Sequence, residues 1–204
     1  VGKLGLRERP KDIPSKQAAA AVGQCELMYT YDKLFSEYHH TVAQLLITGD
    51  DTTNDTRRFN FTNTLNRLLE LGALPVITEN DTVATDAIVI GANDTLAAIP
   101  ATAVHADMLI LLSDIDGLYT ADPHTHPEAK LLHHVAGIDD HIREIAGISS
   151  STQGTGGMVT KLHAADICLG CGCKMVIANG NNPGNLYDIL EGKAVGTTFS
   201  EERL

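Results

Sequence analysis

Residues 107–113, "DMLILLS", decide the fold of this chain. The run from Met108 to Leu112 is apolar without interruption, and the polar pair Ser113 and Asp114 follows it. A short, continuous apolar run bounded by polar residues is typical of a β-strand that is covered on both faces. The sequence therefore predicts a buried strand here, with Asp114 at its carboxyl end.

Similar segments alternate with helical patterns along the rest of the chain. Strands are predicted at 41–48, 74–78 and 174–180, with a short edge strand at 131–135. Helices are predicted at 15–38 with Ser15 as its cap, from a cap at Asp50 or Asp51 to Gly72, and at 93–106, 139–146, 157–171 and 185–192. This alternation indicates a doubly wound α/β sheet with helices on both faces, in which ligands bind at the carboxyl ends of the strands.

Length, charge and hydropathy exclude several classes of protein. A chain of 204 residues fits one large domain better than two small ones. The net charge of −11 would repel a polyanion, so no nucleic acid partner is expected. No apolar run approaches the roughly 18 residues that span a bilayer, so no membrane partner is expected either. The unevenly spaced cysteines favour a reducing, cytoplasmic setting.

Three of the four cysteines crowd together at 168–173, "CLGCGC". A C-x-x-C pair can bind zinc, but no second pair with suitable spacing lies nearby. Small buried thiols are the favoured interpretation.

The stretch "STQGTGGMVTKLHAADICLG", residues 151–170, predicts a phosphate site. Gly154, Gly156 and Gly157 lack a Cβ, so backbone N–H groups can approach a phosphate closely. The helix that follows directs its positive end to the same place, and Lys161 adds a full charge. The spacing differs from that of the Walker P-loop, and a glycine-rich lid without a ligand is the alternative.

Two further polar loops follow predicted strands. Residues 78–96 contain Asp81, Asn93 and Asp94, although solvated turns would have the same composition. Residues 113–123, "SDIDGLYTADP", begin with Ser113 and Asp114. A carboxylate at the end of a buried strand can hold a metal-bound nucleotide or cap the next turn.

Several stretches together resemble a known family. They are "PSKQAAAAVGQ" (14–24), "ENDTVAT" (79–85), "GANDTLAAI" (91–99), "LLSDIDGLYTADP" (111–123) and "GTGGMVTKLHAA" (154–165). Over essentially the whole chain they are similar to the glutamate 5-kinases, a branch of the amino acid kinase family. The resemblance implies an αβα sandwich with a mostly parallel central sheet. It also implies ATP-dependent phosphorylation of the side-chain carboxylate of L-glutamate to L-glutamyl 5-phosphate, the first step of proline biosynthesis.

The resemblance assigns roles to individual residues by position. Asp81 and Asn93 match residues that bind glutamate, and Lys161 and Asp94 match catalytic residues, Asp94 being the acidic group that orients the catalytic lysines. The ATP-binding positions are Ser113, Asp114, Thr155, Gly156, Gly157, Met158, Val159, Thr160 and Lys161.

The same resemblance implies ATP and Mg²⁺ as cofactors. The partners it implies are L-glutamate, proline as a feedback inhibitor, further copies of the chain in a homo-oligomer, and glutamyl phosphate reductase as the next pathway enzyme. It places the protein in the cytoplasm.

Some positions depart from the family pattern. Ala92, Thr78 and Gly49 stand where Asp, Asn and Arg are usual, and Pro100 interrupts a helix. The family's first strand, with a lysine and a glycine-serine loop, and its second glycine-rich loop have no counterpart. We also expect no carboxyl-terminal RNA-binding-like domain of the kind that many members of the family carry. We therefore expect residues 1–204 to be an amino acid kinase domain that is incomplete at its amino terminus.

Two alternative functions stay open on the sequence. One is another amino acid kinase, acting on acetylglutamate or uridine monophosphate, and the stretch "SKQAAAAVGQ" disfavours it. The other is a non-catalytic module that binds a nucleotide or an amino acid. Ala92 and the absent lysine loop favour this second alternative.

Overall fold

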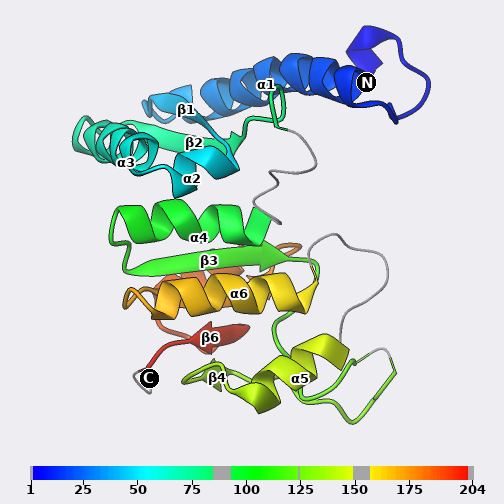
Figure 1. Ribbon diagram of the computed structural model, residues 1–204. Coiled ribbons are helices and arrows are strands. Elements are labelled where there is room, and N and C mark those ends of the chain that lie inside the picture. The colour runs from blue at the N-terminus through cyan, green and yellow to red at the C-terminus, as the bar shows by residue number, and fades with distance from the viewer. Residues whose placement is uncertain (1, 85–92, 124, 149–156, 202–204) are drawn as a thin grey trace. The chain divides into compact units, whose positions relative to one another are not determined.

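A computed structural model describes residues 2–84, 93–123, 125–148 and 157–201. The chain divides into two compact units, Val1–Ile90 and Gly91–Leu204, and each is described by itself (Figure 1). In both units helices alternate with strands, as the sequence predicts.

The first unit is built on a parallel pair of strands. Its elements are the 3₁₀ turn Gly2–Leu4, α1 (Ile13–Ser36), β1 (Val42–Ile47), α2 (Gly49–Thr53), α3 (Asp55–Glu70) and β2 (Leu74–Glu79). β1 and β2 pair in parallel from Val42 opposite Leu74 to Ile47 opposite Glu79. Helix α1 contacts β1, and α3 contacts β2. Three apolar side chains recur at helical spacing along α1, and all are at least a third exposed: Leu27 at 37%, Tyr31 at 37% and Leu34 at 55%.

The predicted helix caps in this unit were wrong. Helix α1 begins with Asp12 as its cap, which accepts a hydrogen bond from the Ser15 N–H at 2.9 Å. The single helix predicted from Asp50 or Asp51 is two helices, α2 and α3. Thr48 caps α2 and donates its own N–H to the Asp51 carboxylate at 2.6 Å, and Asn54 caps α3. At α1 and α3 a side chain just before the first turn accepts a free N–H of that turn, whereas at α2 the Asp51 carboxylate of the first turn accepts the N–H of the cap residue.

The second unit carries a four-stranded sheet. Its elements are α4 (Asn93–Ala103), β3 (Met108–Ser113), β4 (His134–Val135), α5 (Asp140–Ile148), α6 (Met158–Leu169), β5 (Lys174–Asn179), α7 (Asn185–Leu190) and β6 (Thr197–Phe199). The strand order is β3-β5-β6-β4, with β4 at the edge as predicted. β3 pairs with β5 and β4 with β6 in parallel, while β5 and β6 are antiparallel.

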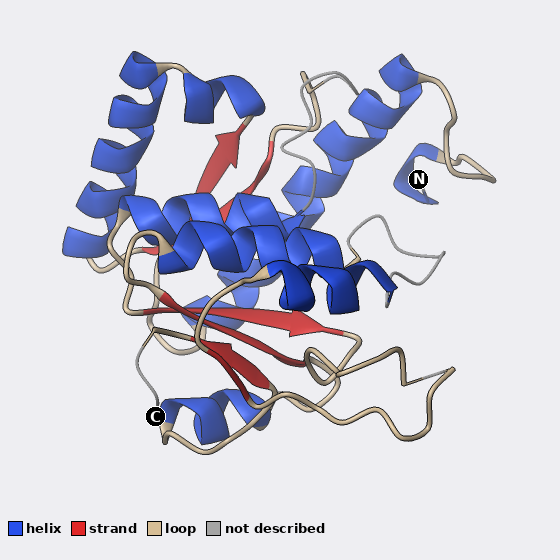
Figure 2. Ribbon diagram, turned by 60° about the horizontal axis from the view of Figure 1, so that its bottom comes forward, coloured by secondary structure: helices blue, strands red, loops and turns tan. Residues whose placement is uncertain are grey.

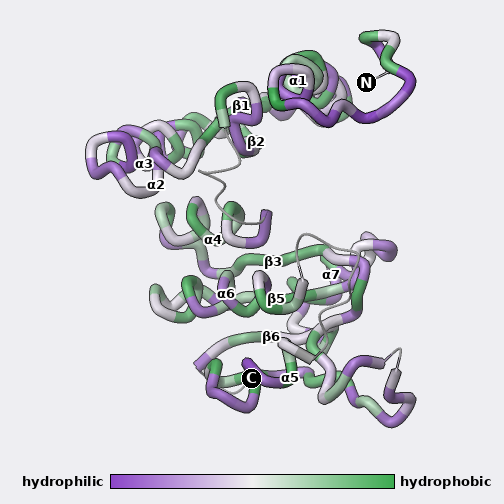
Figure 3. The backbone as a smooth tube through the Cα atoms, turned by 45° about the vertical axis from the view of Figure 1, so that its right-hand side comes forward, coloured by the Kyte–Doolittle hydropathy of each residue, from purple (hydrophilic) through white to green (hydrophobic). Residues whose placement is uncertain are grey.

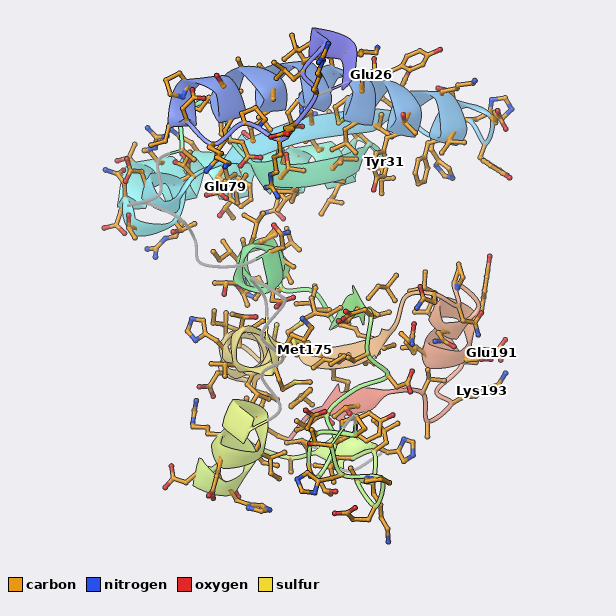
Figure 4. All side chains as sticks on the ribbon, turned by 90° about the vertical axis from the view of Figure 1, so that its right-hand side faces the viewer. Glu26, Tyr31, Glu79, Met175, Glu191 and Lys193 are labelled. Atoms are coloured by element: carbon orange, nitrogen blue, oxygen red, sulfur yellow. The ribbon has the colours of Figure 1, made fainter. Side chains whose placement is uncertain are left out.

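Side chains alternate between the two faces of this sheet, so helices cover both. Met175 and Ile177 of β5 lie in the cluster formed with α4 and α6, whereas Val176 and Ala178 pack against Ile189 of α7. Figures 1 and 2 show α4 and α6 side by side along one face. The strands β3 and β5 stand out as apolar runs in Figure 3, and Figure 4 shows Met175 inside the unit. The prediction of a strand buried on both faces is confirmed for β5, whereas β3 is only partly buried and its Leu112 side chain is 47% exposed.

Helix α4 continues through Pro100 and ends three residues later. Its last turn is closed by the Val104 N–H, which donates to the Pro100 carbonyl at 3.1 Å. In the described ranges, none of the helices combines the length and hydropathy that a membrane crossing needs.

Candidate active site

The amino-terminal end of α6 is the feature that the glycine-rich stretch predicts. Gly157 caps this helix with extended backbone, φ −63° and ψ 178°, and offers no side-chain acceptor. The first-turn N–H groups of a helix have no acceptor within the helix, so this end suits an anion. The Met158 side chain is buried in the core and that of Val159 is exposed. Thr155 and Gly156 lie outside the described residues.

A lysine, a carboxylate and a hydroxyl meet beside this helix end. The Asp94 Oδ2 atom accepts a hydrogen bond from the Thr160 hydroxyl at 2.7 Å, and the Lys161 ammonium lies 3.3 Å from the same oxygen. The Lys161 and Asp94 side chains are 10% and 15% exposed. A negative charge is favourable in the first turn of a helix, which is where Asp94 lies in α4.

This arrangement couples the starts of two helices. Asp94 is in α4 and Thr160 and Lys161 are in α6, and the two helices pack against each other. One carboxylate oxygen therefore restrains the position of a mostly buried cation at a helix end that favours anions. Such a cation can stabilise negative charge that develops on a phosphoryl group.

The carboxyl ends of β3 and β5 lie on the same side of the unit. Ser113 and Asn179 end these strands in register, and the Gly180 N–H donates to the Ser113 carbonyl at 2.8 Å. The Ser113 hydroxyl donates to the neighbouring Asp114 carboxylate at 3.1 Å. Figure 1 shows the starts of α4 and α6 and the end of β3 on this side. The predicted nucleotide-binding residues that are described therefore come from the expected edge of the sheet.

Asp116, Tyr119 and Asn179 form a network at this edge that the sequence reasoning missed. The Asp116 carboxylate accepts hydrogen bonds from the Asn179 amide at 2.8 Å and from the Tyr119 hydroxyl at 2.9 Å. Burial raises the pKa of Tyr119, and the hydrogen bond to Asp116 raises this pKa further. The signal was available, because Asn179 lies near the carboxyl end of the strand predicted at 174–180.

The residues assigned to the amino acid belong to different units. Asp81 is exposed in the turn after β2 of the first unit, where the Asn80 N–H donates to the Ile47 carbonyl at 2.7 Å. Asn93 is exposed as the first residue of α4 in the second unit, directly before Asp94. The assignment of both to glutamate stays a prediction. Ala92 lies outside the described residues.

The cysteine trio has mixed surroundings. Cys168 and Cys173 are buried as expected, but Cys171 is exposed, so the interpretation as small buried thiols was wrong for that residue. Burial, together with the neighbouring Cys173 and Cys171, raises the pKa of Cys168 to about 12. The Cys168 thiol therefore stays protonated near neutral pH and packs as a small apolar group.

Comparison with known proteins gives this site a context. At the level of fold, the chain is similar to the UMP kinase of Bacillus anthracis, with a TM-score of 0.60 and 14% identity over 99% of this chain and 73% of that chain. An isopentenyl phosphate kinase aligns with a TM-score of 0.59 and 20% identity over 91% of this chain and 68% of that chain. At these identities the likeness shows the fold alone.

Sequence relatives are much closer. The chain is 50% identical to the glutamate 5-kinase of Clostridium perfringens over 203 residues, which are 98% of this chain and 76% of the relative. It is 49% identical to the glutamate 5-kinase of Thermoanaerobacter sp. over 98% of this chain and 54% of the relative. The chain thus spans between half and three quarters of the length of these relatives.

The family model described as "Amino acid kinase family" matches residues 3–179. This range covers most of both units and contains every residue of the candidate site. The match, the fold and the relatives agree, and the chain belongs to the amino acid kinase family.

Proposed function

We propose that this chain uses ATP to phosphorylate the side-chain carboxylate of L-glutamate, giving L-glutamyl 5-phosphate for proline biosynthesis. The observation that carries the proposal is the identity of about half the residues, over 98% of the chain, with relatives named glutamate 5-kinase. Lys161, Asp94 and Thr160 at the start of α6 supply chemistry that such a reaction needs.

Phosphoryl transfer demands alignment and positive charge more than covalent help. The first-turn N–H groups of α6 hold the phosphate oxygens of ATP, and the Lys161 ammonium stabilises the charge that builds on the transferred phosphoryl group. Asp94 holds Lys161 in place, and Thr160 fixes the carboxylate of Asp94. Ser113 and Asp114 bind the remainder of the nucleotide at the ends of the strands.

Magnesium fits this site chemically. Mg²⁺ prefers oxygen ligands, and proteins hold it through one or two carboxylates together with the phosphates of the substrate. Asp114 provides such a carboxylate at the sheet edge, where it is exposed. The ion would neutralise part of the phosphate charge.

The proposal is tested by following glutamate-dependent ADP formation with ATP and Mg²⁺ and trapping the product with hydroxylamine. An acyl phosphate gives a hydroxamate, whereas a phosphorylated nucleotide does not. Acetylglutamate and uridine monophosphate serve as competing acceptors. Hydroxamate formed with acetylglutamate, or nucleotide phosphorylation without hydroxamate, would assign the chain to another branch of the family. Nucleotide binding without turnover of any acceptor would make it a non-catalytic module.

Thr160→Val is expected to lower kcat by about tenfold, because a hydrogen bond to a charged group is lost while the side-chain shape is kept. Thr160→Ser keeps the hydroxyl and should stay within about threefold of the unchanged protein. Steady-state kinetics of both variants measure this difference. Equal losses for valine and serine would contradict a role for the hydroxyl.

Asp81→Ala and Asn93→Ala are expected to raise the KM for glutamate by about tenfold or more and to leave the KM for ATP nearly unchanged. Both side chains are exposed in the described units and are assigned to the amino acid. Initial rates at varied glutamate and varied ATP separate the two effects. A rise in the KM for ATP alone would show that these residues belong to the nucleotide site and not to the glutamate site.

The remaining features of the proposal concern assembly and regulation. Residues 1–204 belong to one amino acid kinase domain in the cytoplasm, and the protein is a homo-oligomer. Proline inhibits it as the pathway's end product, and glutamyl phosphate reductase consumes its unstable product. Addition of proline to the hydroxamate assay and mass determination in solution test the first two of these partners.

A further inference from the structure

We infer that Asp116 is a positioning residue for the nucleotide, acting through Asn179 and Tyr119 on the turn that carries Ser113 and Asp114. This inference rests on the proposed function and names residues for it that the family resemblance did not assign. It begins from the hydrogen bonds of the Asp116 carboxylate. Both oxygens are engaged, one by the Asn179 amide at 2.8 Å and the other by the Tyr119 hydroxyl at 2.9 Å.

Asn179 is itself held on several sides. It is the last residue of β5 and lies opposite Ser113, the last residue of β3. Its side-chain oxygen accepts from the Asn181 N–H at 2.9 Å, and its backbone carbonyl accepts from the Asn185 amide at 2.9 Å. The hydrogen bond to Asp116 therefore connects the turn after β3 to a rigid point on the neighbouring strand.

The backbone around Asp116 has little room to move. A Cβ on Gly196 would overlap the Ile177 carbonyl and approach that of Asp116 to 3.0 Å. A Cβ on Gly117, the residue after Asp116, would come within 2.5 Å of the Thr197 hydroxyl. That hydroxyl also accepts from the Leu118 N–H at 2.8 Å. The backbone of the turn at residues 116–118 thus packs closely against β5 and β6. The hydrogen bonds of the Asp116 side chain restrain this turn further.

Tyr119 connects the same carboxylate to the rest of the loop. It pairs with Leu131 in an isolated antiparallel bridge, and the Leu132 N–H donates to the Leu118 carbonyl at 2.8 Å. Its raised pKa keeps the hydroxyl protonated, so it remains a donor to Asp116 at neutral pH. Asp116 consequently holds the turn from both ends, and Ser113 and Asp114 keep the geometry in which they meet the nucleotide.

Exchanging the side chains of Asp116 and Asn179 in the full-length enzyme tests the inference. Asp116→Asn leaves one acceptor for two donors, and Asn179→Asp places two carboxylates face to face. The double variant D116N/N179D restores every hydrogen bond with the direction of one reversed. The amide introduced at position 116 can donate to the carboxylate introduced at position 179 and still accept from Tyr119.

We expect each single variant to raise the KM for ATP by about tenfold or more, with the KM for glutamate within about twofold. The exchange should bring the KM for ATP back to within about threefold of the unchanged enzyme. Isothermal titration with ATP measures the same three variants without catalysis, so the inference is tested even if glutamate is not the acceptor. Equal changes in both KM values, a change in melting temperature alone, or an exchange no better than the single variants would overturn the inference.

Discussion

Lys161→Ala is expected to lower the kcat of glutamate-dependent ADP formation by about a hundredfold or more and to raise the KM for ATP much less. The ammonium group is mostly buried, lies 3.3 Å from Asp94, and belongs to α6, whose start we propose as the phosphate site. The positive charge of the ammonium stabilises the complex most strongly while negative charge moves during phosphoryl transfer. An interaction that strengthens in the transition state appears in kcat rather than in ground-state binding.

The structural effect of the substitution must be separated from the catalytic one. Removing Lys161 leaves Asp94 buried with Thr160 as its remaining described donor, which costs stability. Lys161→Met keeps the apolar stem and should lose kcat to the same extent while losing less stability. Circular dichroism of both variants gives the folded fraction. A kcat that recovers in the methionine variant would assign Lys161 a packing role.

Lys193→Ala is the matched control for charge. Its ammonium lies 2.6 Å from Asp188 and 2.8 Å from Glu191, and its side chain is 59% exposed. Figure 4 shows Lys193 and Glu191 at the surface of the second unit. Exposed ion pairs contribute little to stability, so neither kcat nor stability should change. A loss of kcat in this variant would show that net charge, rather than the position of Lys161, controls the rate.

The sequence predicts the long elements of the second unit well because their patterns are long enough to be unambiguous. β3 and β5 are apolar runs that form strands as predicted, and β5 is buried on both faces, while β3 is partly buried. β6 was missed because three residues carry no usable period. Thr197 is buried there through its hydroxyl, which donates to the Leu132 carbonyl at 2.5 Å and accepts from Leu118. A polar residue that is buried by hydrogen bonding gives no apolar signal.

Some parts of the candidate site could be predicted from local sequence, and others could not. The helix start beside Lys161 follows from the glycines and the lysine in one stretch of sequence, and phosphate binding there stays a prediction. Asp94 lies 67 positions before Lys161, and their pairing came with the family resemblance because spacing carries no information over that distance. Asp116 and Asn179 lie at strand ends, where the general rule for α/β sheets already placed ligand-binding residues. The hydrogen bond between them depends on the register of β3 and β5.

Gly196→Ala is expected to destabilise the second unit by more than about 4 kcal/mol, enough to unfold a marginally stable domain. Gly196 has φ 68°, a left-handed conformation, and a Cβ there would overlap the Ile177 carbonyl. That carbonyl belongs to a central strand, so relief would require β5 or β6 to move. Urea unfolding followed by circular dichroism measures the loss of free energy.

Gly192→Ala separates backbone strain from overlap, because Gly192 has φ 79° and open space around its Cβ position. It should cost about 1 to 2 kcal/mol, as a left-handed conformation does for a residue with a side chain. The excess cost at Gly196 then measures the overlap with Ile177. Similar losses for the two variants would contradict the close approach of β6 to β5. Because Gly196 also lies against the Asp116 carbonyl, any Gly196→Ala protein that still folds should bind ATP more weakly, whereas the Gly192→Ala protein should bind it normally.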